Sequence, residues 1–113
     1  MQRTLVEIRD LLRKHDYPGQ AEVIGELLQL IESDYDQFVQ KIHAVDVWGG
    51  SGAVWETCNF ANEGVPKESV RDDELRFRRA IIELSNQMDE NGIGTERARH
   101  IASVFTEWQR LGV

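Results

Sequence analysis

The chain has 113 residues, of which 41% are hydrophobic and 29% are charged. These values are typical of one globular domain over 1–113 and exclude a disordered chain, which buries too little apolar surface to offset its conformational entropy. The formal net charge of −7 makes the average surface repel phosphate groups, so neither nucleic acid nor a membrane surface is expected as a partner.

Apolar residues in the first third recur at helical spacing and predict two helices. Leu5, Ile8 and Leu12 share one face of a helix over 2–15, which the segment HDYPGQ ends. Pro18 suits the first turn of a second helix. The second helix has a broad apolar face made by Val23, Ile24, Leu27, Leu28 and Ile31.

A third helix is expected from Asp34 to about His43. Asp34 can accept a hydrogen bond from an early backbone amide, while Gln37 can reach back to complete the cap. The apolar stripe of this helix consists of Tyr35, Phe38, Val39 and Ile42. The cap and the stripe agree on where the helix begins.

The segment DVWGGSGAVWE, residues 46–56, then interrupts the helical pattern with three glycines between two tryptophans. The chain must turn sharply here, so at least one of these glycines is expected at positive φ. The three are Gly49, Gly50 and Gly52. Because rings that flank a turn often point to opposite sides, we expect Trp55 in the core and Trp48 at or near the surface.

Two more helices are expected in the second half of the chain. One runs from about Val70 to Met88 and begins with acidic residues that suit a helix N-terminus. These acidic residues are Asp72, Asp73 and Glu74, and its stripe is Phe77, Ile81, Leu84 and Met88. Gly92 can close this helix with Ile93 folded back onto it, and Thr95 can cap the last helix. The face of the last helix is made by Ala98, Ile101, Ala102, Phe105 and Trp108.

These elements predict an all-α fold. The expected architecture is a compact bundle of about five helices with an irregular glycine-rich central loop. Residues 54–60 are aromatic and β-branched enough for a short strand, but they are too few for periodicity to separate a strand from an irregular segment.

The motif GGSG at 49–52 is the nearest approach to a phosphate-binding loop, because glycines let backbone amides converge on an anion. No Lys-Ser or Lys-Thr pair follows it, and a dinucleotide-binding motif starting at Gly50 would need glycine at Trp55. Ser51 has the local spacing of a serine-hydrolase nucleophile, but that nucleophile lies in a much larger sheet. Cys58 is interpreted as a small buried side chain. The sequence therefore predicts no enzyme.

The three histidines, His15, His43 and His100, are far apart in the chain, and no two have the i, i+4 spacing of zinc ligands. We interpret them as surface or helix-end residues and expect neither a metal nor another cofactor. In the segment RDDELRFRR basic and acidic residues alternate within a helical turn, so ion pairs are expected rather than phosphate contacts. The expected pairs join Arg76, Arg78 and Arg79 to Asp72, Glu74 and Glu83.

The location of the protein is predicted from two negative features. Its single cysteine cannot form an internal disulfide, and the start MQRTLVEIRDLLRK is charged where a secretory signal would be apolar. No uncharged apolar stretch approaches the roughly 20 residues that span a bilayer. We therefore expect a cytoplasmic protein.

Residues 46–56, following the helical run LRKHDYPGQAEVIGELLQLI, resemble an uncharacterised family of small bacterial helical proteins. Its members share a hydrophobic-Gly-Gly-x-Gly-Ser core, a short apolar step and an acidic or amide residue. The matching positions are Gly49, Gly50, Gly52 and Glu56, and Ala53 stands where the family often has serine. The resemblance implies a small cytoplasmic α-helical protein of a type suspected of acting as immunity proteins to bacterial toxins.

The expected function is that of a non-catalytic protein-binding module, an immunity or antitoxin protein that occludes a basic toxin. An acidic surface speeds encounter with a basic partner, and aromatic residues supply affinity. The predicted contact residues are Glu32, Asp34, Tyr35, Asp36, Trp48, Gly49, Gly50, Ser51, Gly52, Trp55 and Glu56. One alternative is that the acids only cap the third helix and keep the protein in solution. The other is a small-ligand-binding or regulatory domain that uses the glycine-rich loop.

Overall fold

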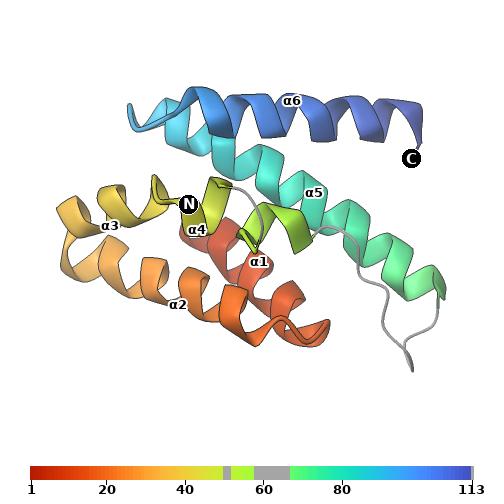
Figure 1. Ribbon diagram of the computed structural model, residues 1–113, viewed down its shortest axis with the longest axis horizontal. Coiled ribbons are helices and arrows are strands. Elements are labelled where there is room, and N and C mark those ends of the chain that lie inside the picture. Colours follow the sequence, from red (N-terminus) through yellow and green to blue (C-terminus); the bar gives the residue numbers. More distant parts are fainter. Residues whose placement is uncertain (50–51, 58–66, 113) are drawn as a thin grey trace.

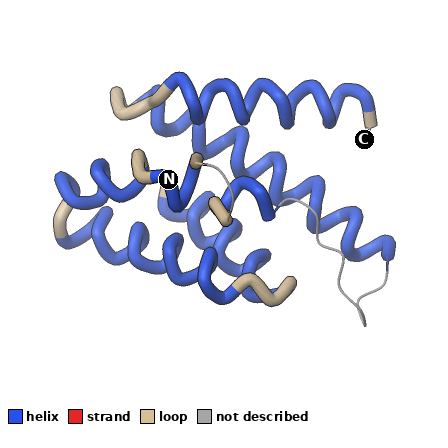
Figure 2. Tube along the Cα trace, in the orientation of Figure 1, coloured by secondary structure: helices blue, strands red, loops and turns tan. Residues whose placement is uncertain are grey.

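The computed structural model describes residues 1–49, 52–57 and 67–112. Within these ranges the chain forms six α-helices and one 3-10 turn, with no β-strand, which confirms the predicted all-α class (Figures 1 and 2). In chain order they are α1 (Gln2–Lys14), α2 (Pro18–Ser33), α3 (Tyr35–Ile42), α4 (Val45–Trp48), η1 (Val54–Thr57), α5 (Lys67–Glu90) and α6 (Glu96–Leu111).

The helices pack in a different spatial order from their order in the sequence. Helix α5 lies between α6 on one side and α1 on the other, and α1 packs in turn against α2 (Figure 1). Helix α3 folds back along α2. The short elements α4 and η1 occupy the middle of the molecule, where α4 contacts both α2 and α6. The glycine-rich segment thus joins the two halves of the bundle.

The predicted apolar stripes form the core. Phe77, Ile81, Leu84 and Met88 of α5 are all fully buried, and so are the three stripe residues of α1. Helix α3 contributes Phe38 and Ile42, and α6 contributes Phe105. Burial of these side chains is the main source of stability, at roughly 25 cal/mol for each Å² of apolar surface removed from water.

Three of the predicted helix starts are also confirmed. The Asp34 carboxylate accepts a hydrogen bond from the Gln37 amide at 3.2 Å, and the Thr95 hydroxyl accepts one from Ala98 at 3.1 Å. Pro18 is the first residue of α2. These caps are local interactions between residues three apart, which explains why the sequence alone predicts them.

Three expectations about the elements need correction. The structure has one helix more than the five predicted. The additional helix is α4, whose four residues are too few to give a periodic pattern. Residues 54–57 form the 3-10 turn η1, so the strand alternative is wrong there, and 58–60 lie outside the described residues. Helix α5 begins at Lys67, which places Asp72 and Asp73 in its second turn instead of at its start.

Two helices end in the same backbone motif with different residues at the left-handed position. At the end of α5, Gly92 has φ 71° and Ile93 donates a hydrogen bond back to the Met88 carbonyl at 2.9 Å. At the end of α1, Asp16 has φ 64° and Tyr17 donates to the Leu12 carbonyl at 2.8 Å. Glycine adopts this conformation without steric cost, whereas aspartate is strained by its Cβ.

The pair predicts opposite effects on stability. Asp16→Gly should raise the free energy of unfolding by about 0.5 kcal/mol, because the backbone strain is relieved. Gly92→Ala should lower it by about 1 kcal/mol, although a Cβ there would meet no atom within 4 Å. Urea unfolding measures both changes. A destabilised Asp16→Gly variant would show that the Asp16 side chain itself holds the turn.

Candidate functional site

The glycine-rich segment places its two tryptophans opposite to expectation. Trp48 is only 2% exposed and belongs to the core, so the prediction that it lies at or near the surface is wrong. Trp55 is partly buried and packs against the edge of the core. The cause is the helical turn α4, which directs Val47 and Trp48 inward together. Trp48 is therefore a structural residue.

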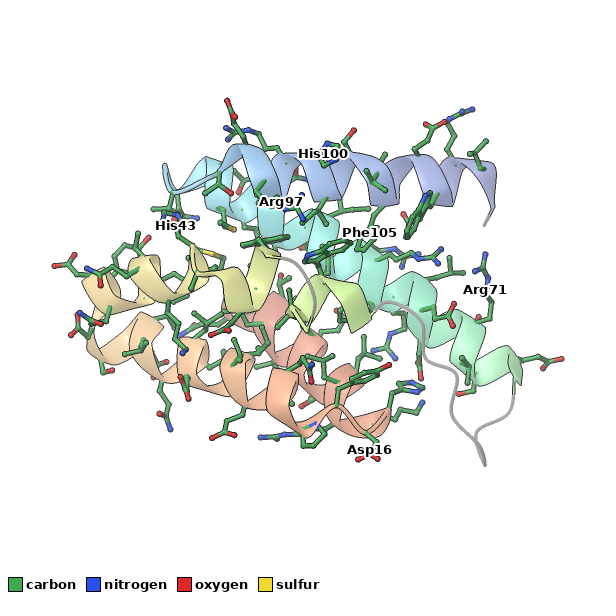
Figure 3. The ribbon with its side chains drawn as sticks, viewed as in Figure 1. Asp16, His43, Arg71, Arg97, His100 and Phe105 are labelled. Carbon is green, nitrogen blue, oxygen red and sulfur yellow. The ribbon has the colours of Figure 1, made fainter. Side chains whose placement is uncertain are left out.

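Arginine 97 of α6 holds this segment in place. Its Nε donates a hydrogen bond of 2.9 Å to the Trp48 carbonyl, and its guanidinium carbon lies 5.6 Å from the centre of the Trp55 ring. The Trp55 indole nitrogen donates to the Gly49 carbonyl at 2.6 Å. Figure 3 shows Arg97 and Phe105 on the side of α6 that faces α4 and η1. One side chain thus contacts both tryptophans of the loop.

The sequence contained a signal for Arg97 that the motif search missed. Arg97 precedes Ile101, Phe105 and Trp108 by four, eight and eleven residues, so it continues the apolar stripe of α6. A cation on such a stripe must either reach solvent or meet a carbonyl or an aromatic face. In this chain it meets both a carbonyl and an aromatic face.

The remaining loop residues are described in part. Gly52 has φ 85°, which confirms that at least one glycine of the motif takes a positive φ. Its carbonyl accepts a hydrogen bond of 3.3 Å from the Gln20 side chain. Gly50 and Ser51 lie outside the described residues, as does the side chain of Glu56. The prediction of a sharp turn that needs glycine is therefore confirmed at Gly52.

Replacing Gly52 with valine should lower the free energy of unfolding by more than about 1 kcal/mol, because a β-branched residue is strained at positive φ. No atom lies within 4 Å of a Cβ built there, so the cost is conformational and not steric. Gly25→Ala in α2 is the matched control, since a Cβ there also meets no atom and alanine favours the helix. A Gly52→Val variant with the melting temperature of the parent would refute the prediction that the turn needs glycine at this position.

The second predicted site is the turn between α2 and α3, where all four candidate residues are exposed. Tyr35 is 44% exposed, and its ring lies 5.5 Å from that of the buried Phe38. Asp34 caps α3, and Glu32 accepts a hydrogen bond from Gln2 at 2.8 Å. Within the described ranges, none of Glu32, Asp34 and Asp36 takes part in an ion pair. We call Glu32, Asp34, Tyr35 and Asp36 the acidic turn.

The structure does not bring the acidic turn and the loop tryptophans into one surface. The acidic turn lies at one end of the bundle, and α4 lies in the middle (Figure 1). Trp48 is buried and cannot contact a partner from its place in the core. The expected composite surface is therefore not formed, and the two parts must be considered separately.

An ion-pair network centred on the buried Asp73 joins the end of α1 to α5. His15 is the C-cap of α1, as predicted for a helix-end residue, but it is not a surface residue, since its side chain is fully buried with Nε2 2.8 Å from an Asp73 carboxylate oxygen. The Lys14 ammonium lies 2.7 Å from the same oxygen, and Arg76 lies 3.5 Å from the other. Asp73, which we expected at an exposed helix start, is 3% exposed.

The charges of this network fix the ionisation of Asp73. Burial alone would raise the pKa of its carboxyl, but hydrogen bonds from Lys14 and His15 outweigh burial and hold the pKa below its ordinary value of 3.8. Asp73 also lies four residues before Phe77 on the apolar stripe of α5, which is the signal that could have predicted its burial. The network therefore links α1 to α5 and has a structural role.

Two arginines of α5, Arg76 and Arg78, contact neighbouring helices, and Arg76 has other partners than those predicted. Arg76 lies 3.4 Å from Glu7 of α1 in addition to Asp73. The buried Arg78 lies over the Trp108 ring at 5.1 Å. Both arginines connect α5 to a neighbouring helix.

Asp73→Asn should lower the free energy of unfolding at neutral pH by about 2 kcal/mol, because it removes the charged acceptor of the hydrogen bonds from the buried His15 and the half-exposed Lys14. Since the folded-state pKa is depressed, the stabilisation is full above the ordinary carboxyl pKa and is lost as pH falls through the folded-state value. Parent and variant should therefore converge in strong acid. Urea unfolding at several pH values measures this, and Asp72→Asn, at an exposed neighbour, should change little. A difference independent of pH would contradict the assignment.

The other candidate chemistry residues are dispersed. Among the described residues, no group of three or more histidine, cysteine, aspartate or glutamate side chains could hold a metal ion. His43 is exposed and donates from Nε2 to the Ile93 carbonyl at 2.7 Å, and His100 is exposed on α6. Cys58 lies outside the described residues. No helix in the described part of the chain has the length and apolar character to cross a membrane.

Comparison with known proteins assigns the chain to no family. No protein-family model, no curated protein and no solved structure matches the chain. The resemblance of residues 46–56 to a family of small bacterial helical proteins therefore stays a prediction.

Proposed function

We propose that this protein is a non-catalytic binding module whose acidic turn recognises a basic protein, in the manner of an immunity or antitoxin protein. The observation that carries the proposal is the exposed Tyr35 ring among three carboxylates that have no cationic partner in the described structure. Tyrosine is enriched among residues that dominate binding energy. Carboxylates around such an anchor attract a basic surface and select against an acidic one.

The geometry of the turn supports this role because Tyr35 is held in position before any partner arrives. Its ring packs on Phe38, which is fully buried, and its backbone begins a helix that Asp34 caps. A side chain fixed in this way loses little conformational entropy on binding. The formal net charge of −7 adds long-range attraction toward a basic partner.

Fewer residues of the glycine-rich segment can contact a partner than the sequence predicts. Trp48 serves the core, so a contact role for the loop falls to its outer residues Gly49, Gly52 and Trp55, away from the acidic turn. The family resemblance of this loop and the single cysteine are the grounds for proposing a cytoplasmic bacterial protein of the immunity type.

The test is a comparative capture from a lysate of the organism that encodes the protein. Immobilised parent protein should enrich a basic protein that the double variant Glu32→Lys, Asp36→Lys does not retain, because the attracting charges are reversed. For the captured protein, the double variant should slow association about tenfold at low salt, and Tyr35→Ala should speed dissociation about tenfold. Surface plasmon resonance separates the two rates.

The matched control is Glu68→Lys, Asp72→Lys, a reversal of two exposed acids near the start of α5. Both double variants change the formal net charge by the same amount, so a merely global charge effect would slow both equally. Capture of a protein that both double variants retain, or equal slowing by both, would contradict the proposed surface.

A further inference from the structure

A small apolar hollow opens on the other side of the molecule, between α6 and η1. Its volume is about 200 Å³, and three aromatic rings and two aliphatic side chains line most of it, namely Trp55, Phe105, Trp108, Ile101 and Val104. The Phe105 ring lies between the two indoles, 6.3 Å from Trp55 and 5.3 Å from Trp108 between ring centres. Phe105 is fully buried, so the aromatic surface that the hollow offers belongs to the partly buried indoles of Trp55 and Trp108.

Arg97 and His100 complete the rim of the hollow. The Nε atom of Arg97 donates a hydrogen bond to the Trp48 carbonyl, and the guanidinium carbon lies near the Trp55 ring, so two contacts restrain this exposed side chain. Its two terminal nitrogens have no hydrogen-bond or ion-pair partner within the described residues. Arg99, two residues along, is by contrast paired with Asp89 at 2.6 Å.

Arg97 differs in this respect from five other arginines. Those that form an ion pair with a carboxylate are Arg9, Arg71, Arg76, Arg99 and Arg110. The terminal nitrogens of a fixed guanidinium match the two oxygens of a carboxylate, with which they form two parallel hydrogen bonds. Arg97 therefore presents a preorganised anion-binding group at the edge of an aromatic hollow.

We propose that this hollow binds a small aromatic carboxylate. The ring of the ligand lies against the partly buried indoles of Trp55 and Trp108, while its carboxylate pairs with the terminal nitrogens of Arg97. The exposed imidazole of His100 can donate a further hydrogen bond at the rim. This ligand site is independent of the acidic turn and of the partner proposed for it.

The size of the hollow selects the class of ligand. A cavity of about 150 Å³ admits one benzene ring, so a hollow of about 200 Å³ holds a single ring with a short substituent. A nucleotide needs a larger site, since pockets for ligands of that size are roughly 300–1,000 Å³. The charge of Arg97 then favours an acid over an amine or a neutral compound of the same shape.

Phenylacetate tests the proposal, with phenylacetamide and phenethylamine as neutral and cationic probes of the same ring. In ¹⁵N NMR titrations of the parent, phenylacetate should shift the indole N–H signals of Trp55 and Trp108 more than that of Trp48. Both control probes should bind at least about tenfold more weakly. Absence of binding by phenylacetate at millimolar concentration, or equal affinity for phenylacetamide, would overturn the proposal.

Two variants locate the ligand. Arg97→Lys keeps the charge but removes the paired donors, and we expect at least about a fivefold loss of phenylacetate affinity. Val104→Phe should fill the hollow and abolish binding while Arg97 stays in place. Arg99→Gln, at an exposed position of the same helix, is the control and should keep the parent affinity. Retained affinity in Arg97→Lys, or in a folded Val104→Phe variant, would show that the hollow is not the site.

Discussion

The arrangement of the central segment depends on the hydrogen bond from Arg97 to the Trp48 carbonyl. It joins residues 49 positions apart and fixes α6 against the short helix α4. The same guanidinium covers the Trp55 ring, and Trp55 returns a hydrogen bond to the Gly49 carbonyl. The partly buried Trp48 carbonyl needs a hydrogen-bond donor. Without Arg97 this carbonyl would either become exposed to solvent or remain without a hydrogen bond.

Two separate surfaces follow from this arrangement. With Trp48 directed inward, the partly buried Trp55 lines the hollow on α6, and Tyr35 is exposed at the acidic turn. The first surface combines aromatic faces with a cation, and the second combines an aromatic ring with carboxylates. They have opposite electrostatic preferences, so the two ligands that we propose, a basic protein and a small acid, would not compete for the same residues.

Local interactions could be predicted from the sequence, and long-range contacts could not. The caps of Asp34 and Thr95 join residues three apart, and the apolar stripes repeat within single helices, so both are visible in the sequence. The contact of His15 with Asp73 spans 58 positions and depends on how α1 and α5 pack. Its one sequence signal is that Asp73, like Arg97, stands on an apolar stripe, where a charge must find a partner.

A double-mutant cycle between Arg97 and Trp55 tests the central claim most directly. Arg97→Met and Trp55→Leu each remove one side of the contact, and urea unfolding of the parent, both single variants and the double variant gives the coupling free energy. If Arg97 organises the segment, the coupling should be about 1 kcal/mol in favour of the pair. Stability changes that add within about 0.3 kcal/mol would show that the two residues act independently and would contradict the account.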